Sequence, residues 1–296
     1  MLKRILLIVA VSLCTLCAAA LCACIAPPST EPGPNAPATD ESDGLIVRFI
    51  DVGQGDAALI SCSGHHMLID GGSSDASRKI YAILQTLDID WLDAIVATHS
   101  DADHIGGISG ALNYAGAGAC FCSVTEADSK TFASMKRYLE KAGCPIMVPD
   151  PGDSFSLGGA TVTFVGPTRA FEDDNNTSVV CRIDYGQTSV LFTGDAERES
   201  EQAMIDDGAN LSATLLKVAH HGSGSSTSEA FLQTVHPSYA VISVGEGNDW
   251  GHPHQSVLDR LAHHNVAIWR TDIEGSIIAT SDGHAFEFET VTMIER

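Results

Sequence analysis

The chain has 296 residues, enough for one α/β domain of roughly 200 to 250 residues with a well-buried core. Its hydrophobic content of 44% and charged content of 18% are those of a globular protein and exclude a largely disordered chain. Lys and Arg number 16 against 38 Asp and Glu, so no broad surface for binding nucleic acid is expected. Any recognition of phosphate must therefore be local.

The N-terminal segment has the pattern of an export signal, because Lys3 and Arg4 precede an apolar run over residues 5–23. The run ends in LCAC at 21–24, which resembles the lipobox of bacterial lipoproteins. We therefore expect residues 1–23 to be removed as a signal peptide and Cys24 to carry lipid. An uncleaved membrane helix is the alternative, because the run is about as long as a minimal span. Either way the sequence predicts an extracytoplasmic protein, anchored to the cell membrane as a lipoprotein or else secreted.

Residues 24–44 are expected to be a spacer between the lipidated cysteine and the domain. The segment is rich in Pro, Ser, Thr, Ala and acidic residues, and its prolines deny it both helical and sheet hydrogen bonds. Residues 45–296 then form the folded domain. Its cysteines are Cys62, Cys120, Cys122, Cys144 and Cys181. The sequence favours small buried core residues for most of them, and a bridge from Cys120 or Cys122 to Cys144 is the alternative.

Short apolar runs alternate with amphipathic segments along the whole domain. The runs predict strands over 45–50, 57–62, 66–69, 94–97, 119–124, 161–165, 178–184, 190–193, 214–219, 239–244, 267–270 and 276–280, with a half-exposed strand at 286–289. Helical spacing predicts helices over 76–87, 129–141, 196–205, 228–235 and 255–264. No short fixed period is present, which excludes a solenoid. Strands interleaved with helices in two halves predict a single-domain αββα sandwich.

The most informative segment is THSDADHIGG at 98–107, which directly follows the predicted buried strand 94–97. It places His99, Asp101, Asp103 and His104 within six residues. Imidazoles and carboxylates at such spacing on a tight loop point several donor atoms to one place, as a two-metal site requires. A polar turn that caps a helix is the simpler interpretation, but it rarely combines two His and two Asp with Gly-Gly.

This segment resembles the HxHxDH signature of the metallo-β-lactamase superfamily, with Asp101 in place of the second His. The variant is similar to the extracellular hydrolase domain of ComEC-type competence proteins. The likeness extends over most of residues 45–282. It rests on FIDVGQGD at 49–56, LIDGG at 68–72, LFTGD at 191–195, VAHHGS at 218–223 and GHPH at 251–254, which match in order.

The resemblance implies a metallo-β-lactamase fold and a site for two divalent metal ions, Zn²⁺ or Mn²⁺. It implies that His99 and Asp101 bind the first metal, that Asp103 and His104 bind the second, and that Asp195 bridges the two. The last ligand is His220 or His221, and we favour His220. Without the resemblance, Asp195 would also fit a helix cap.

One expected ligand is absent from the sequence. The superfamily usually supplies a further His to the first metal before the bridging Asp, but residues 105–219 contain no His. NNTS at 175–178 lies at about this place in the order of motifs. We expect water, an Asn or Ser oxygen, or His252 to complete the first metal. Because oxygen donors replace imidazole, the site shifts from Zn²⁺ toward Mn²⁺.

Other residues of the motifs have predicted supporting or catalytic roles. Asp51, Asp56 and Asp70 are expected to accept hydrogen bonds from metal-bound imidazoles or, alternatively, from turn backbone. Asp103 is expected to orient the nucleophile. His221, Ser223 or His252 would stabilise the developing oxyanion or protonate the leaving group.

These observations predict a phosphodiesterase or nuclease that acts on DNA or on a phosphorylated envelope component. A hydrolase of lactones, lactams or thioesters is the second hypothesis, since the same fold carries it. A surface lipoprotein that binds metal without catalysis is the third. Metal content and turnover of a generic phosphodiester would distinguish them.

Overall fold

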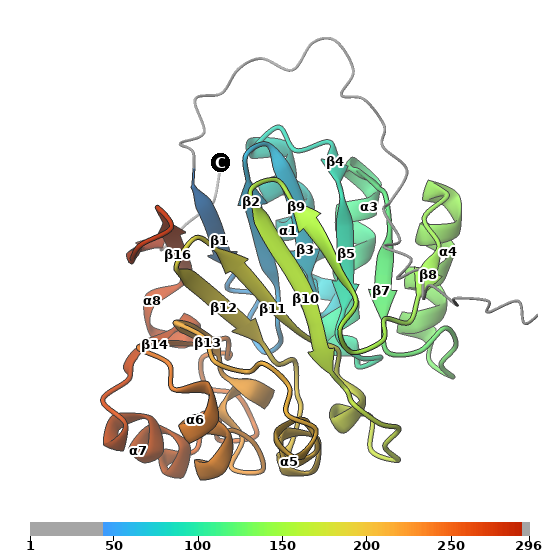
Figure 1. The fold of residues 1–296 in the computed structure, drawn as a ribbon. Coiled ribbons are helices and arrows are strands. Elements are labelled where there is room, and N and C mark those ends of the chain that lie inside the picture. Colours follow the sequence, from blue (N-terminus) through green and yellow to red (C-terminus); the bar gives the residue numbers. More distant parts are fainter. Residues whose placement is uncertain (1–43, 292–296) are drawn as a thin grey trace, which may run out of the picture.

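Two β-sheets lie face to face at the centre of the computed structural model, which describes residues 44–291 (Figure 1). The first sheet has eight strands in the order β17-β16-β1-β2-β3-β5-β7-β8. Their bounds are β1 Leu45–Phe49, β2 Ala58–Cys62, β3 His65–Ile69, β5 Ala94–Ala97, β7 Cys120–Cys122, β8 Ile146–Met147, β16 Ser276–Ser281 and β17 Phe286–Val291. Strands β3, β5, β7 and β8 run parallel, and the others are antiparallel.

The second sheet has seven strands in the order β15-β14-β13-β12-β11-β10-β9. Their bounds are β9 Ser154–Leu157, β10 Ala160–Gly166, β11 Val180–Tyr185, β12 Thr188–Phe192, β13 Leu215–Lys217, β14 Tyr239–Ile242 and β15 Ala267–Arg270. Strands β12 to β15 are parallel. A separate pair is formed by β4 Trp91–Leu92 and β6 Gly116–Ala117.

Helices cover the outer face of each sheet (Figure 1). The first sheet is covered by α1 Ser77–Thr86, α3 Ile108–Tyr114 and α4 Lys130–Ala142, and the second by α5 Arg198–Asp206, α6 Glu229–Val235 and α7 Gln255–His263. The short helices are α2 Ala102–Ile105 and α8 Thr271–Glu274, with 3₁₀ turns η1 Ser74–Ala76, η2 Asn175–Thr177 and η3 Ala219–Gly222.

The hydrophobic core has three layers, because successive residues of a strand point to opposite faces of its sheet. In β3, Met67 and Ile69 pack between the two sheets, whereas Leu68 packs under the outer helices. The strands of the second sheet behave in the same way, with Val190 facing inward and Leu191 facing α5 to α7. The predicted αββα sandwich and its single domain are thereby confirmed.

Most predicted elements are present with bounds that differ by one or two residues. Several elements were not predicted, among them helix α3, which contains Gly110 and directly follows Gly106 and Gly107, and the edge strand β9, which is short and polar. The predicted strand 214–219 ends at Lys217, because the chain then turns into η3. All five cysteines of the domain are buried and free of disulfides, which confirms them as small core residues.

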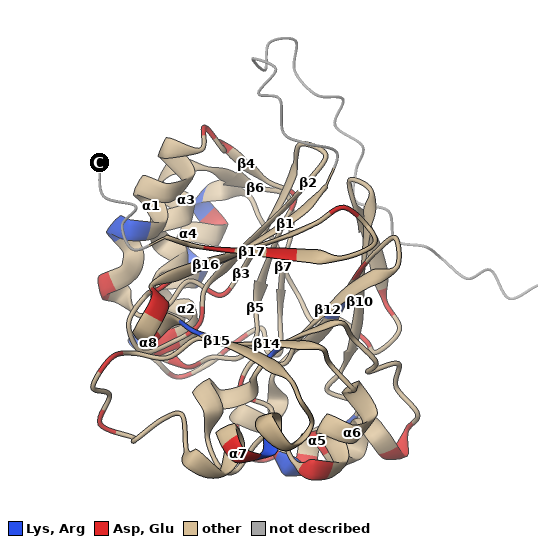
Figure 2. Ribbon diagram, turned by 90° about the vertical axis from the view of Figure 1, so that its left-hand side faces the viewer, with Lys and Arg blue, Asp and Glu red and all other residues tan. Residues whose placement is uncertain are grey.

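The acidic residues of the described domain are distributed over both helical layers, and the few Lys and Arg positions are scattered in the view of Figure 2. In residues 44–291 no helix has both the length and the apolar character to cross a membrane. The predicted signal peptide, Cys24 and the spacer lie outside the described residues, apart from Gly44.

Candidate metal centre

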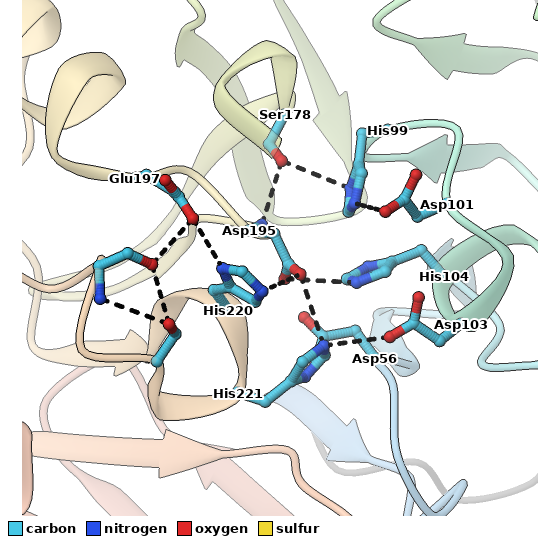
Figure 3. Close-up of polar contacts among 12 residues, drawn as sticks. Asp56, His99, Asp101, Asp103, His104, Ser178, Asp195, Glu197, His220 and His221 are labelled. Atoms are coloured by element: carbon cyan, nitrogen blue, oxygen red, sulfur yellow. Dashed lines mark hydrogen bonds and ion pairs between the residues drawn. The ribbon is translucent and has the colours of Figure 1, made fainter. Parts of the chain in front are cut away.

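Five loops bring polar side chains together at one end of the sandwich. Three of them follow the carboxyl ends of β5, β12 and β13, where open α/β sheets usually bind ligands. The fourth follows β3 and the fifth precedes β2. Together they contribute Asp70 and the residues labelled in Figure 3 as Asp56, His99, Asp101, Asp103, His104, Asp195, His220 and His221.

The segment from His99 to His104 combines buried imidazoles with more exposed carboxylates. Helix α2 begins just after Asp101, and the His104 amide donates to the Asp101 carbonyl at 3.1 Å. The rings of His99 and His104 are fully buried and 4.2 Å apart. The side chains of Asp101 and Asp103 are 48% and 36% exposed. The turn therefore directs both imidazoles inward and leaves both carboxylates at the mouth of the cluster.

Supporting groups fix the Nδ1 atom of each buried imidazole. His104 Nδ1 lies 2.9 Å from Asp70 Oδ2, and a carboxylate can only accept, so this nitrogen carries the proton. Thr98 Oγ1 donates to the same carboxylate at 2.7 Å and lies 3.1 Å from His99 Nδ1, from which it can accept. His221 Nδ1 donates to the Ser243 carbonyl at 3.0 Å. In the neutral form of each ring, the Nε2 lone pair is therefore the one available to a metal.

The three Nε2 atoms are buried and have no hydrogen-bond partner in the described part of the chain, and the same is true of Asp195 Oδ1. His104 Nε2 lies 3.3 Å from Asp195 Oδ1. His221 Nε2 lies 3.3 Å from Asp103 Oδ2 and 3.5 Å from Asp195 Oδ2. An unsatisfied buried polar atom costs about 1–3 kcal/mol. Such a cost over several converging atoms is expected where a metal ion supplies the missing partner.

The arrangement fits divalent metal ions, because sets of one carboxylate and two imidazoles have ligand atoms within 4.8 Å of one another. One set is His99, His104 and Asp195, and another is Asp103, His104 and His221. Imidazole nitrogen and carboxylate oxygen are ligands for Zn²⁺, Mn²⁺ and Fe²⁺. Asp195 lies near the imidazoles of His104 and His221, so its carboxylate can contribute to more than one such set.

The two adjacent histidines of η3 have different environments. Both residues adopt left-handed backbone, with φ of 49° at His220 and 52° at His221. His221 is buried and belongs to the metal-compatible sets, whereas His220 belongs to none of them. The Nδ1 atom of His220 lies 3.2 Å from Glu197 Oε1, and its Nε2 atom lies 3.7 Å from Asp195 Oδ2 (Figure 3). The geometry thus favours His221 over the predicted His220 as the last ligand.

The other two predicted residues lie at the margin of the cluster. Asp101 Oδ2 is 3.8 Å from His99 Nε2, and Asp101 belongs to none of the metal-compatible sets. The ring of His252 packs edge-on against His220 at 5.5 Å and lies 6.4 Å from that of His221. Burial, together with these two imidazoles, lowers the pKa of His252 to about 4. His252 is therefore a neutral side chain at neutral pH.

The NNTS segment lies behind the ligands instead of among them. Ser178 Oγ accepts a hydrogen bond from the Asp195 amide at 3.1 Å and lies 3.4 Å from His99 Nδ1. Asn176 Oδ1 accepts from the amides of Glu197 and Ser200, both at 3.1 Å, and so satisfies donors at the start of α5. These oxygens hold the loop that carries Asp195.

The carboxylates and imidazoles of the cluster shift each other's pKa values. Burial favours the neutral acid, but His104 and His221 outweigh burial and hold the pKa of Asp195 well below its usual range. Burial lowers the pKa of His221, but Asp195 and Asp56 outweigh it and raise that pKa to about 10. The pKa of His104 rises well above its ordinary value in the same way, through Asp195 and Asp70. The same carboxylates that favour protonation of these imidazoles would also attract a divalent cation. A bound cation would displace the proton, because a metal binds the neutral imidazole.

The geometry and the sequence together define the class of protein. A family model described as the Metallo-beta-lactamase superfamily matches residues 50–246, and the chain belongs to this superfamily. The chain is 31% identical over 250 residues to ComE operon protein 3 of Bacillus subtilis (strain 168), a match that covers 78% of this chain and 32% of that protein. It is 31% identical over 244 residues to Competence protein ComA of Neisseria gonorrhoeae, covering 81% and 33%.

The fold is also that of solved metallo-β-lactamase structures. The chain superposes on the crystal structure of the metallo-beta-lactamase fold protein YhfI from Bacillus subtilis with a TM-score of 0.56 at 14% sequence identity. The match covers 80% of this chain and 100% of that chain. The chain spans about a third of the length of the two curated relatives. It is therefore a metallo-β-lactamase superfamily member related to competence proteins.

Two groups at the site were not predicted as site residues from the sequence. Glu197 accepts from Ser225 Oγ at 2.8 Å and faces His220. Lys217 Nζ lies 2.7 Å from Asp56 Oδ2. Burial favours the neutral acid, but Lys217 and His221 lower the pKa of Asp56 to about 2. The GDAE pattern at 194–197 was the only local signal for Glu197, and Lys217 lies within a predicted strand.

The three aspartates expected to support imidazoles have different roles. Asp70 contacts His104, and Asp56 Oδ1 lies 3.2 Å from His221 Nδ1. Asp51 instead accepts from the Gly53 amide at 3.0 Å, which is the alternative turn role.

Proposed function

We propose that this protein is an exported, two-metal hydrolase of phosphodiesters, in nucleic acid or in a phosphorylated envelope component. The observation that carries the proposal is the convergence of three buried imidazole Nε2 atoms, each without a hydrogen-bond partner among residues 44–291, on the carboxylate of Asp195. Similarity to competence proteins supports a nucleic-acid substrate, and the acidic domain supports local recognition of the phosphate at the metals.

The proposed ligands come from three loops, which follow β5, β12 and β13, and they differ from the sequence-based set at one position. They are His99, Asp101, Asp103, His104, Asp195 and His221, with His221 in place of His220. Bound divalent ions, Mn²⁺ or Zn²⁺, would lower the pKa of water and polarise the scissile group. Support for this set comes from the burial of the imidazoles and from the hydrogen bonds to Nδ1 that orient them.

The chain's own residues would then position the substrate and the nucleophile. Asp103 lies on the first turn of α2 and is partly exposed. Its carboxylate can therefore accept a hydrogen bond from the attacking nucleophile and orient it. His220 is held by Glu197 beside Asp195 and is 22% exposed, which makes its ring accessible to substrate oxygens. His252 packs against His220 and restricts the orientation of that ring. The expected catalytic residues are therefore Asp103 and His220, and His252 is a positioning residue for His220.

A substrate screen tests the proposal. Purified protein loaded with Mn²⁺ or Zn²⁺ is given single-stranded DNA, RNA, nucleotides and chromogenic phosphodiester, lactone and lactam substrates, with Asp195→Ala as the inactive control. We expect metal-dependent cleavage of a phosphodiester. If only the lactone or the lactam is turned over, the proposed phosphodiester substrate is wrong. Metal binding without turnover of any substrate would favour a non-catalytic protein.

We also propose that Cys24 carries lipid and tethers the domain to the outer side of the cell membrane. Support comes from the LCAC sequence at 21–24 and the Pro-rich segment that follows it. Cys24→Ala should release or mislocalise the protein in fractionated cells. Unchanged membrane association, with Met1 retained in the purified product, would favour an uncleaved anchor.

A further inference from the structure

Lys217 forms a buried ion pair beside the proposed metal ligands. It is the last residue of β13, and its side chain is 3% exposed. The Nζ atom lies 2.7 Å from Asp56 Oδ2 and donates to the Val218 carbonyl at 2.9 Å. Lysine is almost never buried to this extent unless it is paired, and burying an ion pair carries a desolvation cost. A specific role must offset that cost.

The second oxygen of the same carboxylate faces a proposed ligand. Asp56 Oδ1 lies 3.2 Å from His221 Nδ1, which also donates to the Ser243 carbonyl. Because the Ser243 carbonyl accepts from Nδ1 and the nearby carboxylate of Asp56 has no proton to donate, Nδ1 keeps its proton, and the Nε2 lone pair points toward Asp103 and Asp195. Asp56 therefore favours the tautomer and the ring orientation that metal binding requires.

The backbone also holds Asp56 in place. Its amide donates to the Asp103 carbonyl at 3.2 Å, and its carbonyl accepts from the Gly72 amide at 2.7 Å. Asp56 precedes β2 of the first sheet, whereas Lys217 ends β13 of the second. The ion pair thus connects the two sheets immediately before the turn that carries His221.

An unpaired Asp56 carboxylate would interfere with the centre. Its oxygens lie within 4.8 Å of the ligand atoms of Asp195 and His221 in one metal-compatible set, and of His104 in another. It could therefore compete for a metal ion or repel the neighbouring carboxylate. The ammonium group of Lys217 gives this carboxylate a fixed partner.

We propose that Lys217 is a positioning residue: by pairing with Asp56 it withholds this carboxylate from the metals and keeps it against Nδ1 of His221. This inference rests on the proposed metal centre. Lys217 would have no direct contact with substrate or metal, and its whole effect would pass through Asp56.

The test compares metal binding by Lys217→Met, Asp56→Asn and the double variant. Metal-free full-length protein is titrated calorimetrically with Mn²⁺, and visible absorption of bound Co²⁺ reports the coordination of the ligands. We expect each single substitution to lower the affinity for one of the two bound metals by about 10–100-fold and to change the Co²⁺ absorption spectrum. The double variant should bind no more weakly than the weaker single variant, because the effects share one route. Arg270→Met is the matched control, since it removes an ion pair of 2.6 Å to Asp272 away from the site, and it should bind metal like wild type.

The outcomes separate this inference from the proposed function. If the wild type binds no metal, the centre and the inference both fail. If the wild type binds two metals and Lys217→Met matches its affinities and Co²⁺ spectrum, the inference alone is overturned. Losses that multiply in the double variant also overturn it, because Lys217 would then act independently of Asp56. Should Lys217→Met fail to fold, Asp56→Asn decides: wild-type affinity overturns the inference, and a loss equal to that of the double variant supports it.

Discussion

Gly107→Ala is a sharp test of how the metal-binding segment is built. Gly107 has φ of −83° and ψ of −9°, which alanine adopts without strain, so only steric contact can oppose the substitution. A Cβ atom there would lie 1.9 Å from the Gly71 carbonyl oxygen, which is backbone and cannot rotate away. Overpacking costs up to about 3 kcal/mol. The reduced entropy of the unfolded chain offsets about 0.4–1 kcal/mol. The net loss of stability should be about 2 kcal/mol.

Urea unfolding at constant m-value and thermal unfolding would measure this loss, and the melting temperature should fall by roughly 4–8 °C. Metal affinity should fall as well, because the Gly71 amide donates to the His104 carbonyl at 2.7 Å and the two loops must separate. Gly208→Ala is the control: its φ of +70° makes alanine strained, but nothing lies within 4 Å. It should lower stability and leave metal binding unchanged. A Gly107→Ala protein as stable as wild type would refute the reasoning.

Three further predictions concern the centre itself. Asp195→Ala should fold but lose at least about 100-fold in hydrolytic rate, whereas His284→Ala, an exposed residue, should match wild type; near-normal turnover by Asp195→Ala would disprove the shared carboxylate. His221→Ala should lose one of two metals in elemental analysis and His220→Ala should keep both, and the reverse result would restore His220 as the ligand. EDTA should abolish turnover and Mn²⁺ or Zn²⁺ should restore it, so turnover that survives complete metal removal would exclude metal-dependent hydrolysis.

Much of the fold could be predicted because its strands are buried on both faces. Strand β5, Ala94–Ala97, has the predicted bounds, since all four residues are buried and the apolar run marks the whole element. The edge strand β9, Ser154–Leu157, was missed because its partly exposed polar residues resemble a loop. Helix α3 was missed because Gly110, which accommodates the Ser77 carbonyl, interrupts the helical pattern. The glycine is required there because α3 packs closely against the start of α1, and the local sequence pattern carries no information on that contact.

The candidate site shows the same limit at the level of single residues. His99 and His104 could be predicted because a tight turn after a buried strand constrains where they point. For His220 and His221, the composition of the pair is uninformative, since either imidazole can bind a metal. Two consecutive left-handed residues rotate the chain so that His221 faces inward and His220 faces Glu197. That choice depends on backbone dihedrals, which the sequence of the pair does not specify.

The supporting charges lie still further from what the sequence can predict. Lys217 lies in a strand whose three residues are all buried, where a lysine would ordinarily argue against burial. It is tolerated because a carboxylate from the other sheet meets it at 2.7 Å. Asp56, in turn, precedes its own strand in a glycine-rich turn that would equally suit an exposed residue. Each charge makes the burial of the other possible, so the sequence around either residue alone does not predict that it is buried. The pair forms only when the two sheets pack together, and that packing also brings Asp56 next to His221.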